Sequence, residues 1–244
     1  MSTDADIPIE VLRRYGLSPT QPTLLDNGLI NQTWLLDAKG TRYILQRVNP
    51  MFGPEVHQDI ATVTTHLYQK GIMVPRLIPA DDGCHYVRDK DAVWRLYDYL
   101  AGVSFNTVRS PAIAFEAGAT LARFHQGLLD LDYCFKNRRR GVHDTRQHIQ
   151  NLQTSLESKQ DHPRFMDVLP LATEILTTIS QVPGLPDLPP RKVHGDPKIS
   201  NFLFQKETGK GLSMLDFDTL GEMSLALELG DAMRSWCNPA GENT

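Results

Sequence analysis

Apolar and polar residues alternate along much of the first hundred positions of the chain. Residues 32–37 and 41–48 are strand-like runs separated by a short turn that ends in glycine, which predicts a β-hairpin. Residues 85–88 and 92–97 predict a second hairpin, and residues 23–25 predict a short strand before the first one. The amino-terminal part of the chain is therefore predicted to form a small antiparallel sheet.

Helical spacing replaces this alternation between the hairpins and again after residue 98. Apolar residues recur at spacings of four, three and four from Val56 to Leu67, which predicts a helix between the hairpins. The pair Ser110-Pro111 is typical of a helix start, with an N-cap followed by a first-turn proline. Residues 144–158 and 164–181 predict two further helices.

These patterns predict a chain of two lobes. A β-rich lobe over residues 1–98 is followed by a hinge over residues 99–102 and by a helical lobe over residues 103–244. The predicted fold class is α+β, with a small antiparallel sheet in the N-lobe and a mostly helical C-lobe. A length of 244 residues suffices for one large domain or two small lobes.

Charge and cysteine content exclude several classes of protein. The net charge of −4 argues against a nucleic-acid partner, and the basic run at residues 136–140 is interpreted as a solvated loop. Three widely spaced cysteines without a C-x-x-C pattern indicate reduced thiols. The sequence contains no signal peptide and no apolar run of membrane-spanning length, so we predict a cytoplasmic protein without a membrane partner. The oligomeric state is not determined by the sequence.

The stretch H-G-D-P-K-I-S-N, residues 194–201, carries the clearest chemistry. It places an acid, Asp196, five residues before an amide, Asn201. The apolar runs that follow predict a hairpin that brings Asp216 and Asp218 near them. Phosphoryl transfer needs such a set, because a carboxylate must meet the acceptor hydroxyl and oxygen ligands must hold Mg²⁺ against the phosphates.

Protein kinases use H-R-D-x-x-x-x-N followed by D-F-G for this purpose. Here the strings are H-G-D-x-x-x-x-N and D-F-D, in the same order. The chain thus resembles the aminoglycoside phosphotransferase-like kinase superfamily, whose hallmarks are these two motifs. The resemblance implies a bilobal protein-kinase-like fold, a nucleotide-binding N-lobe, and an enzyme that uses ATP and Mg²⁺.

Five segments narrow the resemblance. Residues 27–36, 43–49, 142–146, 194–204 and 229–235 look like N-acetylhexosamine 1-kinases and their close relatives. This implies phosphorylation of a sugar by ATP, at the anomeric hydroxyl of GlcNAc or GalNAc. The alternatives are another small-molecule hydroxyl kinase, acting on an aminoglycoside, choline or homoserine, and a non-catalytic or truncated nucleotide-binding pseudokinase.

The resemblance assigns roles to residues of the two motifs. Asp196 is the predicted catalytic base or orienting group, and Asn201 and Asp216 are the predicted Mg²⁺ ligands. Lys198 is predicted to neutralise the transferring phosphate, the alternative being a solvated loop lysine. Two roles are predicted for Asp218: an acid that supports the metal ligands from behind, or a residue that forms the turn.

Two further residues have predicted structural roles. His194 is expected to hold the loop by hydrogen bonds rather than to act as an acid or base. Asp231, which follows Gly230, is expected near the start of a helix. It is interpreted either as an N-cap or as a buried acid that braces the catalytic-loop backbone.

The nucleotide site is predicted in the N-lobe and at the hinge. Gly28 and Asn31 belong to a turn predicted to cover the phosphates, although an ordinary β-turn would have the same pattern. Asp98 and Tyr99 lie at the predicted hinge, where backbone groups near Tyr99 would receive the purine edge. An ordinary linker is the alternative for that segment.

One departure from the kinase pattern concerns the third strand. Aligning its sequence with the kinase motif V-A-I-K puts Gln46 where kinases have a phosphate-binding lysine. Strand alternation turns Arg47 to the opposite face unless a bulge intervenes. Either Arg47 reaches the phosphates or Mg²⁺ and other groups neutralise the charge. The sequence does not identify the acid that would pair with such a cation, and Glu55 and Asp59 are the candidates.

The acceptor is predicted to bind in the helical lobe. His143, Asp144 and Arg146 have polar side chains suited to sugar hydroxyls, and a helix N-cap at Asp144 would explain the pattern without a substrate. Members of the superfamily continue well past the position of Asp231, whereas thirteen residues follow it here. We therefore expect an incomplete acceptor site and exposed apolar surface on the C-lobe.

Overall fold

The computed structural model of the chain contains two compact units. The larger, here termed the main unit, comprises Met1–Arg138 and Pro190–Thr244. The smaller comprises Arg139–Pro189 and is termed the hairpin unit, because its described residues form two consecutive helices. The structure describes residues 7–18, 22–25, 30–137, 143–184 and 188–241.

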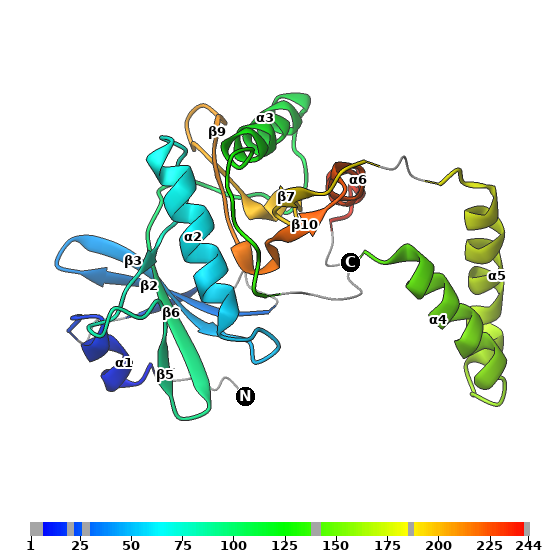
Figure 1. Ribbon diagram of the computed structural model, residues 1–244, viewed down its shortest axis with the longest axis horizontal. Coiled ribbons are helices and arrows are strands. Elements are labelled where there is room, and N and C mark those ends of the chain that lie inside the picture. Colours follow the sequence, from blue (N-terminus) through cyan, green and yellow to red (C-terminus); the bar gives the residue numbers. More distant parts are fainter. Residues whose placement is uncertain (1–6, 19–21, 26–29, 138–142, 185–187, 242–244) are drawn as a thin grey trace. The chain divides into compact units, whose positions relative to one another are not determined.

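The main unit contains a six-stranded antiparallel sheet (Figure 1). Its strand order is β1-β2-β3-β6-β4, and β5 also pairs with β6. Leu45 lies opposite Trp34 on one neighbouring strand and opposite Leu96 on the other. The strands are β1 (Thr23–Leu25), β2 (Gln32–Ala38), β3 (Thr41–Val48), β4 (Leu77–Ile78), β5 (Val87–Asp89) and β6 (Ala92–Asp98). Both predicted hairpins and the predicted first strand are confirmed.

Buried apolar side chains cover both faces of this sheet. On one face Trp34, Leu45 and Trp94 pack in a cluster with α1 (Ile9–Arg14), a six-residue helix too short to show a period in the sequence. On the other face lies α2 (Glu55–Gln69), the helix predicted between the hairpins. Figure 1 shows α2 running along the sheet. Alternate residues of each strand therefore enter different cores.

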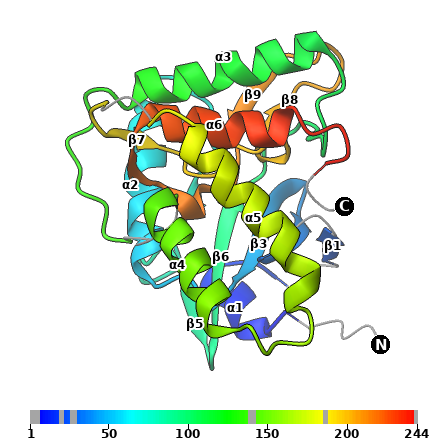
Figure 2. The ribbon, with the colours of Figure 1, turned by 90° about the vertical axis from the view of Figure 1, so that its right-hand side faces the viewer.

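Most of the remaining elements of the main unit share a core with α2. The remaining elements are α3 (Pro111–Gly127), β7 (Arg191–Val193), η1 (Ile199–Asn201), β8 (Phe202–Phe204), β9 (Gly211–Met214), η2 (Phe217–Thr219), β10 (Gly221–Met223) and α6 (Leu225–Trp236). The hairpin of β8 and β9 packs on α3, and β7 pairs with β10. One buried cluster runs from Val48 and Ile60 to Phe204 and Phe217. Figure 2 shows α6 beside α3. The sheet and these helices are thus joined by continuous apolar packing.

Polar side chains cap three of the helices. The Ser110 hydroxyl accepts a hydrogen bond from the Ile113 N–H at 3.3 Å, as predicted for the start of α3. The Asp144 carboxylate accepts one from the Gln147 N–H at 3.0 Å and caps α4. The N-cap of α6 is Ser224, so the prediction that Asp231 lies near a helix start was wrong. Asp231 lies within α6 because the apolar spacing begins earlier, at Leu225.

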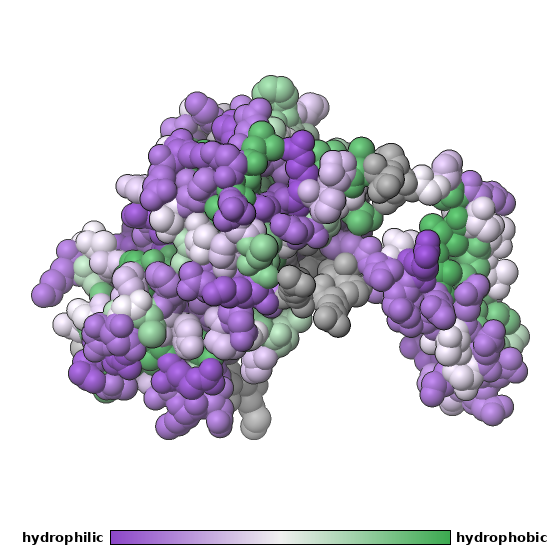
Figure 3. Space-filling view, viewed as in Figure 1, coloured by the Kyte–Doolittle hydropathy of each residue, from purple (hydrophilic) through white to green (hydrophobic). Residues whose placement is uncertain are grey.

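The hairpin unit consists of α4 (Thr145–Ser158) and α5 (Phe165–Gln181). Only Ala172 of these two helices is fully buried. Apolar side chains of α5 are largely solvent-exposed, among them Met166, Val168, Leu171 and Ile175. They form part of the hydrophobic colouring on this helix in Figure 3. Exposed apolar surface was expected in the helical lobe, and α5 carries it.

Two properties of the described residues bear on the compositional predictions. Cys84, Cys134 and Cys237 are all free and exposed. None of the helices that the structure describes has the length and hydrophobicity needed to cross a lipid bilayer.

The packing predicts unequal effects for two neighbouring changes in β3. Leu45 is fully buried, whereas Arg47, on the same strand, is exposed. We expect Leu45→Ala to lower the free energy of unfolding by about 2–5 kcal/mol, because it leaves a cavity in the core. Arg47→Ala is expected to change it by about 0.5 kcal/mol or less. Urea denaturation measures both, and equal losses would contradict the described packing.

Candidate active site

A buried carboxylate of α6 holds the loop that carries Asp196. Glu228 is fully buried, and its Oε1 accepts hydrogen bonds from the N–H groups of His194 at 2.7 Å and Gly195 at 3.1 Å. Asp231, the acid predicted as a possible brace, instead pairs with Arg234 on its own helix. Asp231 is one turn away from Glu228, so the predicted brace exists but belongs to a different residue.

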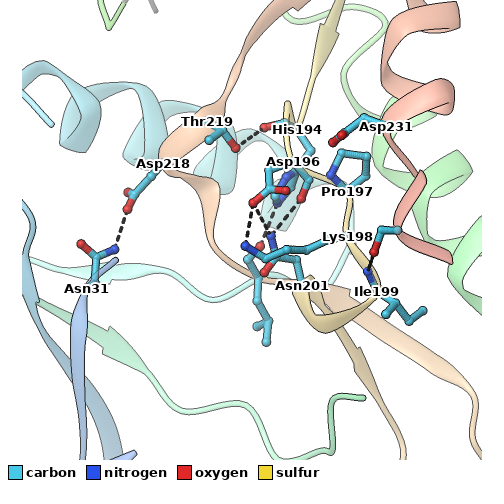
Figure 4. Close-up of polar contacts among 12 residues, drawn as sticks. Asn31, His194, Asp196, Pro197, Lys198, Ile199, Asn201, Asp218, Thr219 and Asp231 are labelled. Atoms are coloured by element: carbon cyan, nitrogen blue, oxygen red, sulfur yellow. Dashed lines mark hydrogen bonds and ion pairs between the residues drawn. The ribbon is translucent and has the colours of Figure 1, made fainter. Parts of the chain in front are cut away.

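His194 links this loop to the strand that precedes Asp216. Its imidazole Nε2 donates to the carbonyl oxygen of Leu215 at 2.8 Å, and its own carbonyl accepts from the Thr219 hydroxyl at 2.8 Å (Figure 4). Burial lowers the pKa of His194. A neutral imidazole is the form expected in such surroundings, which agrees with the structural role predicted for this residue.

Gly195 has a conformation that other residues rarely adopt. Its φ is +81°, in the left-handed region, and a Cβ atom at this position would lie 2.2 Å from the carbonyl oxygen of Thr219. The glycine between His194 and Asp196 is therefore required by the close approach of two loops.

Asp196 is held by the two residues with which the sequence associates it. The Asn201 amide donates to the Asp196 carbonyl oxygen at 2.9 Å and to its Oδ2 at 3.2 Å. Lys198 Nζ donates to the same Oδ2 at 2.9 Å (Figure 4). The side chains of Asp196 and Lys198 are both partly exposed, at 23% and 19%. The predicted base, the predicted phosphate-neutralising lysine and the predicted metal ligand thus form one cluster.

Asp216 lies beside Asn201 because β8 and β9 are paired. The N–H of Leu215 donates to the carbonyl oxygen of Asn201 at 2.8 Å, which joins the two predicted metal ligands through the backbone. Asp216 itself adopts a left-handed conformation with φ 62°. Burial, together with the nearby Asp218, raises the pKa of Asp216 to about 6.

Asp218 points away from this cluster, toward the sheet. It is buried and accepts two hydrogen bonds from the guanidinium of Arg95, one of them at 2.8 Å. Asn31 Nδ2 donates to Asp218 Oδ2 at 2.7 Å (Figure 4). Although burial acts to raise the pKa of Asp218, Arg95 holds it below its usual value. Asp218 is thus a buried acid that is paired with Arg95 and lies two residues after Asp216, the predicted metal ligand.

The third strand places Gln46 and Arg47 on opposite faces. Gln46 lines the hinge pocket. Its side chain accepts a hydrogen bond from Arg95 Nε at 2.9 Å and donates one to the Thr33 hydroxyl at 3.1 Å. Arg47 is exposed and contacts Gln32. No bulge interrupts the pairing of β3 with β6, so Arg47 stays on the face opposite Gln46. Charge neutralisation by other groups is therefore favoured over Arg47.

Neither candidate acid of α2 pairs with a cation in the described part of the chain. The buried Asp59 carboxylate accepts hydrogen bonds from the Tyr133 hydroxyl and from the N–H groups of Lys136 and Asn137. Glu55 is exposed in the first turn of α2. The acid paired with a buried cation is instead Asp218.

Asp216 is one of the residues that line a pocket at the predicted hinge. The pocket lining combines apolar residues with the predicted hinge residues: Ile44, Gln46, Pro75, Tyr97, Asp98, Tyr99, Leu100, Leu215, Asp216 and Phe217. The Asp98 carboxylate accepts a hydrogen bond from the Arg76 N–H at 2.6 Å. A mainly apolar lining that includes a carboxylate suits a flat heterocycle that carries phosphates.

The other predicted site residues lie elsewhere. Gly28 falls outside the described residues. The Asn31 amide group is occupied within the protein, since it binds Asp218 and accepts from the Asn49 N–H. His143, Asp144 and Arg146 belong to the hairpin unit, where Asp144 is the N-cap of α4, as one of its two interpretations proposed.

Comparison with known families and structures identifies this arrangement. Residues 22–244 match the family described as Phosphotransferase enzyme family. The chain belongs to this family. Its α+β fold is that of the protein-kinase-like phosphotransferases, as the resemblance implied.

Solved structures of such phosphotransferases share the fold at low sequence identity. The amicoumacin kinase hAmiN has 20% identity and a TM-score of 0.59, with 90% of this chain and 65% of that one covered. An aminoglycoside phosphotransferase from Alicyclobacillus acidocaldarius has 19% identity and a TM-score of 0.64, with 96% and 72% covered. A microcompartment-associated aminopropanol kinase has 18% identity and a TM-score of 0.60, with 92% and 72% covered. The chain thus spans about two thirds of the length of these proteins.

Sequence reasoning did not select two residues that shape this phosphotransferase site. Arg95 and Glu228 each interrupt an apolar run, V-W-R-L-Y and L-A-L-E-L. A charged residue within an apolar run is a signal for a buried and paired charge, since burial of an unpaired one is costly. The sequences of β6 and α6 both contain such a charged residue within an apolar run.

The contacts of Glu228 predict that its replacement lowers the stability of the fold more than replacement of Asp231. Glu228→Ala removes a buried carboxylate that accepts hydrogen bonds from two buried N–H groups, and loss of such an acceptor costs about 1–3 kcal/mol. Asp231→Ala removes an ion pair whose arginine is exposed. We expect thermal or urea unfolding to show a clear loss of stability for Glu228→Ala and a small change for Asp231→Ala. A reversed order would show that Glu228 does not hold the loop.

Proposed function

We propose that the protein is an ATP-dependent kinase that phosphorylates a hydroxyl group of a small molecule, with an N-acetylhexosamine as its acceptor. The observation that carries the proposal is the cluster of Asp196, Asn201 and Asp216 next to the apolar pocket of the hinge. Membership of the phosphotransferase family supports the reaction class.

Asp196 is the group proposed to meet the acceptor hydroxyl. Its Oδ2 receives hydrogen bonds from Asn201 and Lys198, which fix the orientation of the carboxylate. Partial exposure leaves it accessible to a substrate. In this position the carboxylate orients the hydroxyl and accepts its proton as the oxygen attacks the γ-phosphorus of ATP. The bond from this phosphorus to the β–γ bridging oxygen breaks, and ADP leaves. Lys198 stabilises negative charge that develops on the transferred group.

Asn201 and Asp216 would hold Mg²⁺. The donor set fits this ion, because one carboxylate and one amide oxygen leave room for phosphate and water ligands. Asn201 uses its amide nitrogen to bind Asp196, so the amide oxygen is the atom suited to a metal. When bound, Mg²⁺ would supply positive charge to the nucleotide phosphates.

ATP is proposed to bind in the hinge pocket. The apolar residues Ile44, Pro75 and Phe217 would enclose the purine, and the backbone near Tyr99 would bind its edge. The phosphates would then extend toward Asp216. Two relatives with this fold, the amicoumacin kinase and a spectinomycin phosphotransferase, are described in complex with AMP-PNP and with ADP, respectively.

The choice of a sugar acceptor depends on the resemblance to N-acetylhexosamine 1-kinases over five segments of the sequence. Relatives with this fold are described as acting on other molecules, including spectinomycin and aminopropanol. An aminoglycoside, choline or homoserine kinase remains the second candidate within the same reaction class.

Release of ADP in the presence of a panel of acceptors tests this function. We expect turnover with GlcNAc or GalNAc and little with amino alcohols or aminoglycosides. Asp196→Asn should reduce kcat by about 10²–10⁴-fold, because it removes the proposed proton acceptor. Binding of an ATP analogue should be unchanged. The matched control is Asp132→Asn, at an exposed aspartate, which should keep full activity.

Two outcomes would contradict the proposal. Full activity of Asp196→Asn would remove the role of this carboxylate. Nucleotide binding by the wild-type protein without turnover of any acceptor would indicate a non-catalytic binding protein.

The raised pKa of Asp216 predicts how pH affects metal binding. Protonation competes with a metal ion for the carboxylate, so Mg²⁺ affinity should fall as the pH drops below about 6, the pKa of Asp216. Titration of the nucleotide complex with Mg²⁺ at pH 7.5 and pH 5.5 measures this difference. Asp216→Asn should bind Mg²⁺ more weakly at both values and lose most of the pH dependence. Equal affinities of the wild-type protein at both pH values would contradict the assignment.

A further inference from the structure

The nucleotide side of the site contains a buried cation in an unexpected place. Gln46 stands where the kinase pattern has a lysine, and its neutral side chain supplies no charge. Arg95 lies directly opposite Gln46 in the pairing of β3 with β6. Only 1% of the Arg95 side chain is exposed. The positive charge is thus one strand away from the lysine position.

The guanidinium of Arg95 is committed to two partners. Its Nε donates to Gln46 Oε1 at 2.9 Å, and its two terminal nitrogens donate to the two oxygens of Asp218. A two-pronged contact of this kind fixes both the distance and the orientation of the carboxylate. Asp218 is 2% exposed, so neither charge of the pair is screened by water.

Asp218 in turn fixes the turn that carries Asp216. The two acids are separated by one residue, at the start of η2 (Phe217–Thr219). Asn31 adds a third hydrogen bond to the Asp218 carboxylate, and Asn31 also accepts from the Asn49 N–H at 2.9 Å. Contacts from β6 and from the residues around β2 and β3 therefore converge on one side chain. The left-handed backbone of Asp216 is held next to this anchored residue.

We propose that Arg95 is a positioning residue for phosphoryl transfer. Through its clamp on Asp218 it holds Asp216 in the conformation that would bind the metal. This inference depends on the proposed function of Asp216 as a metal ligand.

A purely structural role would not require these charges. Replacement of a buried ion pair by apolar residues of similar volume is often neutral or stabilising. Removal of one partner alone is destabilising, because the other charge stays buried and unpaired. A variant that removes both charges therefore separates stability from positioning.

The decisive experiment compares three variants with the wild-type protein. The first is a double variant that carries both Arg95→Met and Asp218→Leu, and the second is the single variant Arg95→Lys. The third is the control Arg88→Met, at an exposed arginine of the neighbouring strand β5. Circular dichroism and urea unfolding report whether each variant folds. Titration of ADP binding with Mg²⁺ and the dependence of kcat on Mg²⁺ report the position of Asp216.

We expect the double variant to fold, to require more Mg²⁺ for half-maximal nucleotide binding, and to lose about 10²-fold in kcat through misplacement of the site. Arg95→Lys should lose part of this activity, since an ammonium group lacks the planar fork of the guanidinium. Arg88→Met should match the wild-type protein.

A folded double variant with wild-type Mg²⁺ response and kcat would overturn the inference. If the double variant fails to fold, Arg95→Lys decides, and a wild-type Mg²⁺ response of that variant would overturn it. Failure of the proposed function has a different signature, because the wild-type protein itself would then turn over no acceptor, whatever the Mg²⁺ response of the variants.

Discussion

The geometry of the candidate site depends on one buried carboxylate. Glu228 accepts hydrogen bonds from the N–H groups of His194 and Gly195. An unpaired N–H in this interior would be costly, so the loop must follow the position of α6. Asp196 comes directly after these two residues. The place of the proposed base is therefore set by the packing of a helix that contributes no reacting atom.

From this loop a continuous chain of polar contacts reaches the sheet. Asn201 joins Asp196 to the backbone of Leu215, and the next residue is Asp216. Asp218 then connects the same turn to Arg95 on β6. Apolar packing between α2, α3 and the β8–β9 hairpin holds both ends of this chain within one core. The acids are thus held by contacts from two sides, from α6 and from the sheet.

Local pattern predicted the elements of this structure well, and long-range pairing was harder. The β2–β3 hairpin and the Ser110 cap depend on residues close in sequence, and both were confirmed. Clustering of Asp196 with Asn201 followed from motif spacing. The partners of Arg95 and Glu228 are 123 and 34 residues away, so no local period indicates them. Such pairs are set by tertiary packing and are visible in the sequence only as charges within apolar runs.

The central claim is that Asn201 and Asp216 hold a metal ion against the phosphates of ATP. A crystal structure of the protein with a non-hydrolysable ATP analogue and Mn²⁺ tests it most directly, because anomalous scattering locates the metal. The account predicts Mn²⁺ between the Asn201 amide oxygen and the Asp216 carboxylate, with the adenine in the pocket lined by Ile44 and Tyr99. A metal ion bound elsewhere, or a nucleotide outside this pocket, would contradict it.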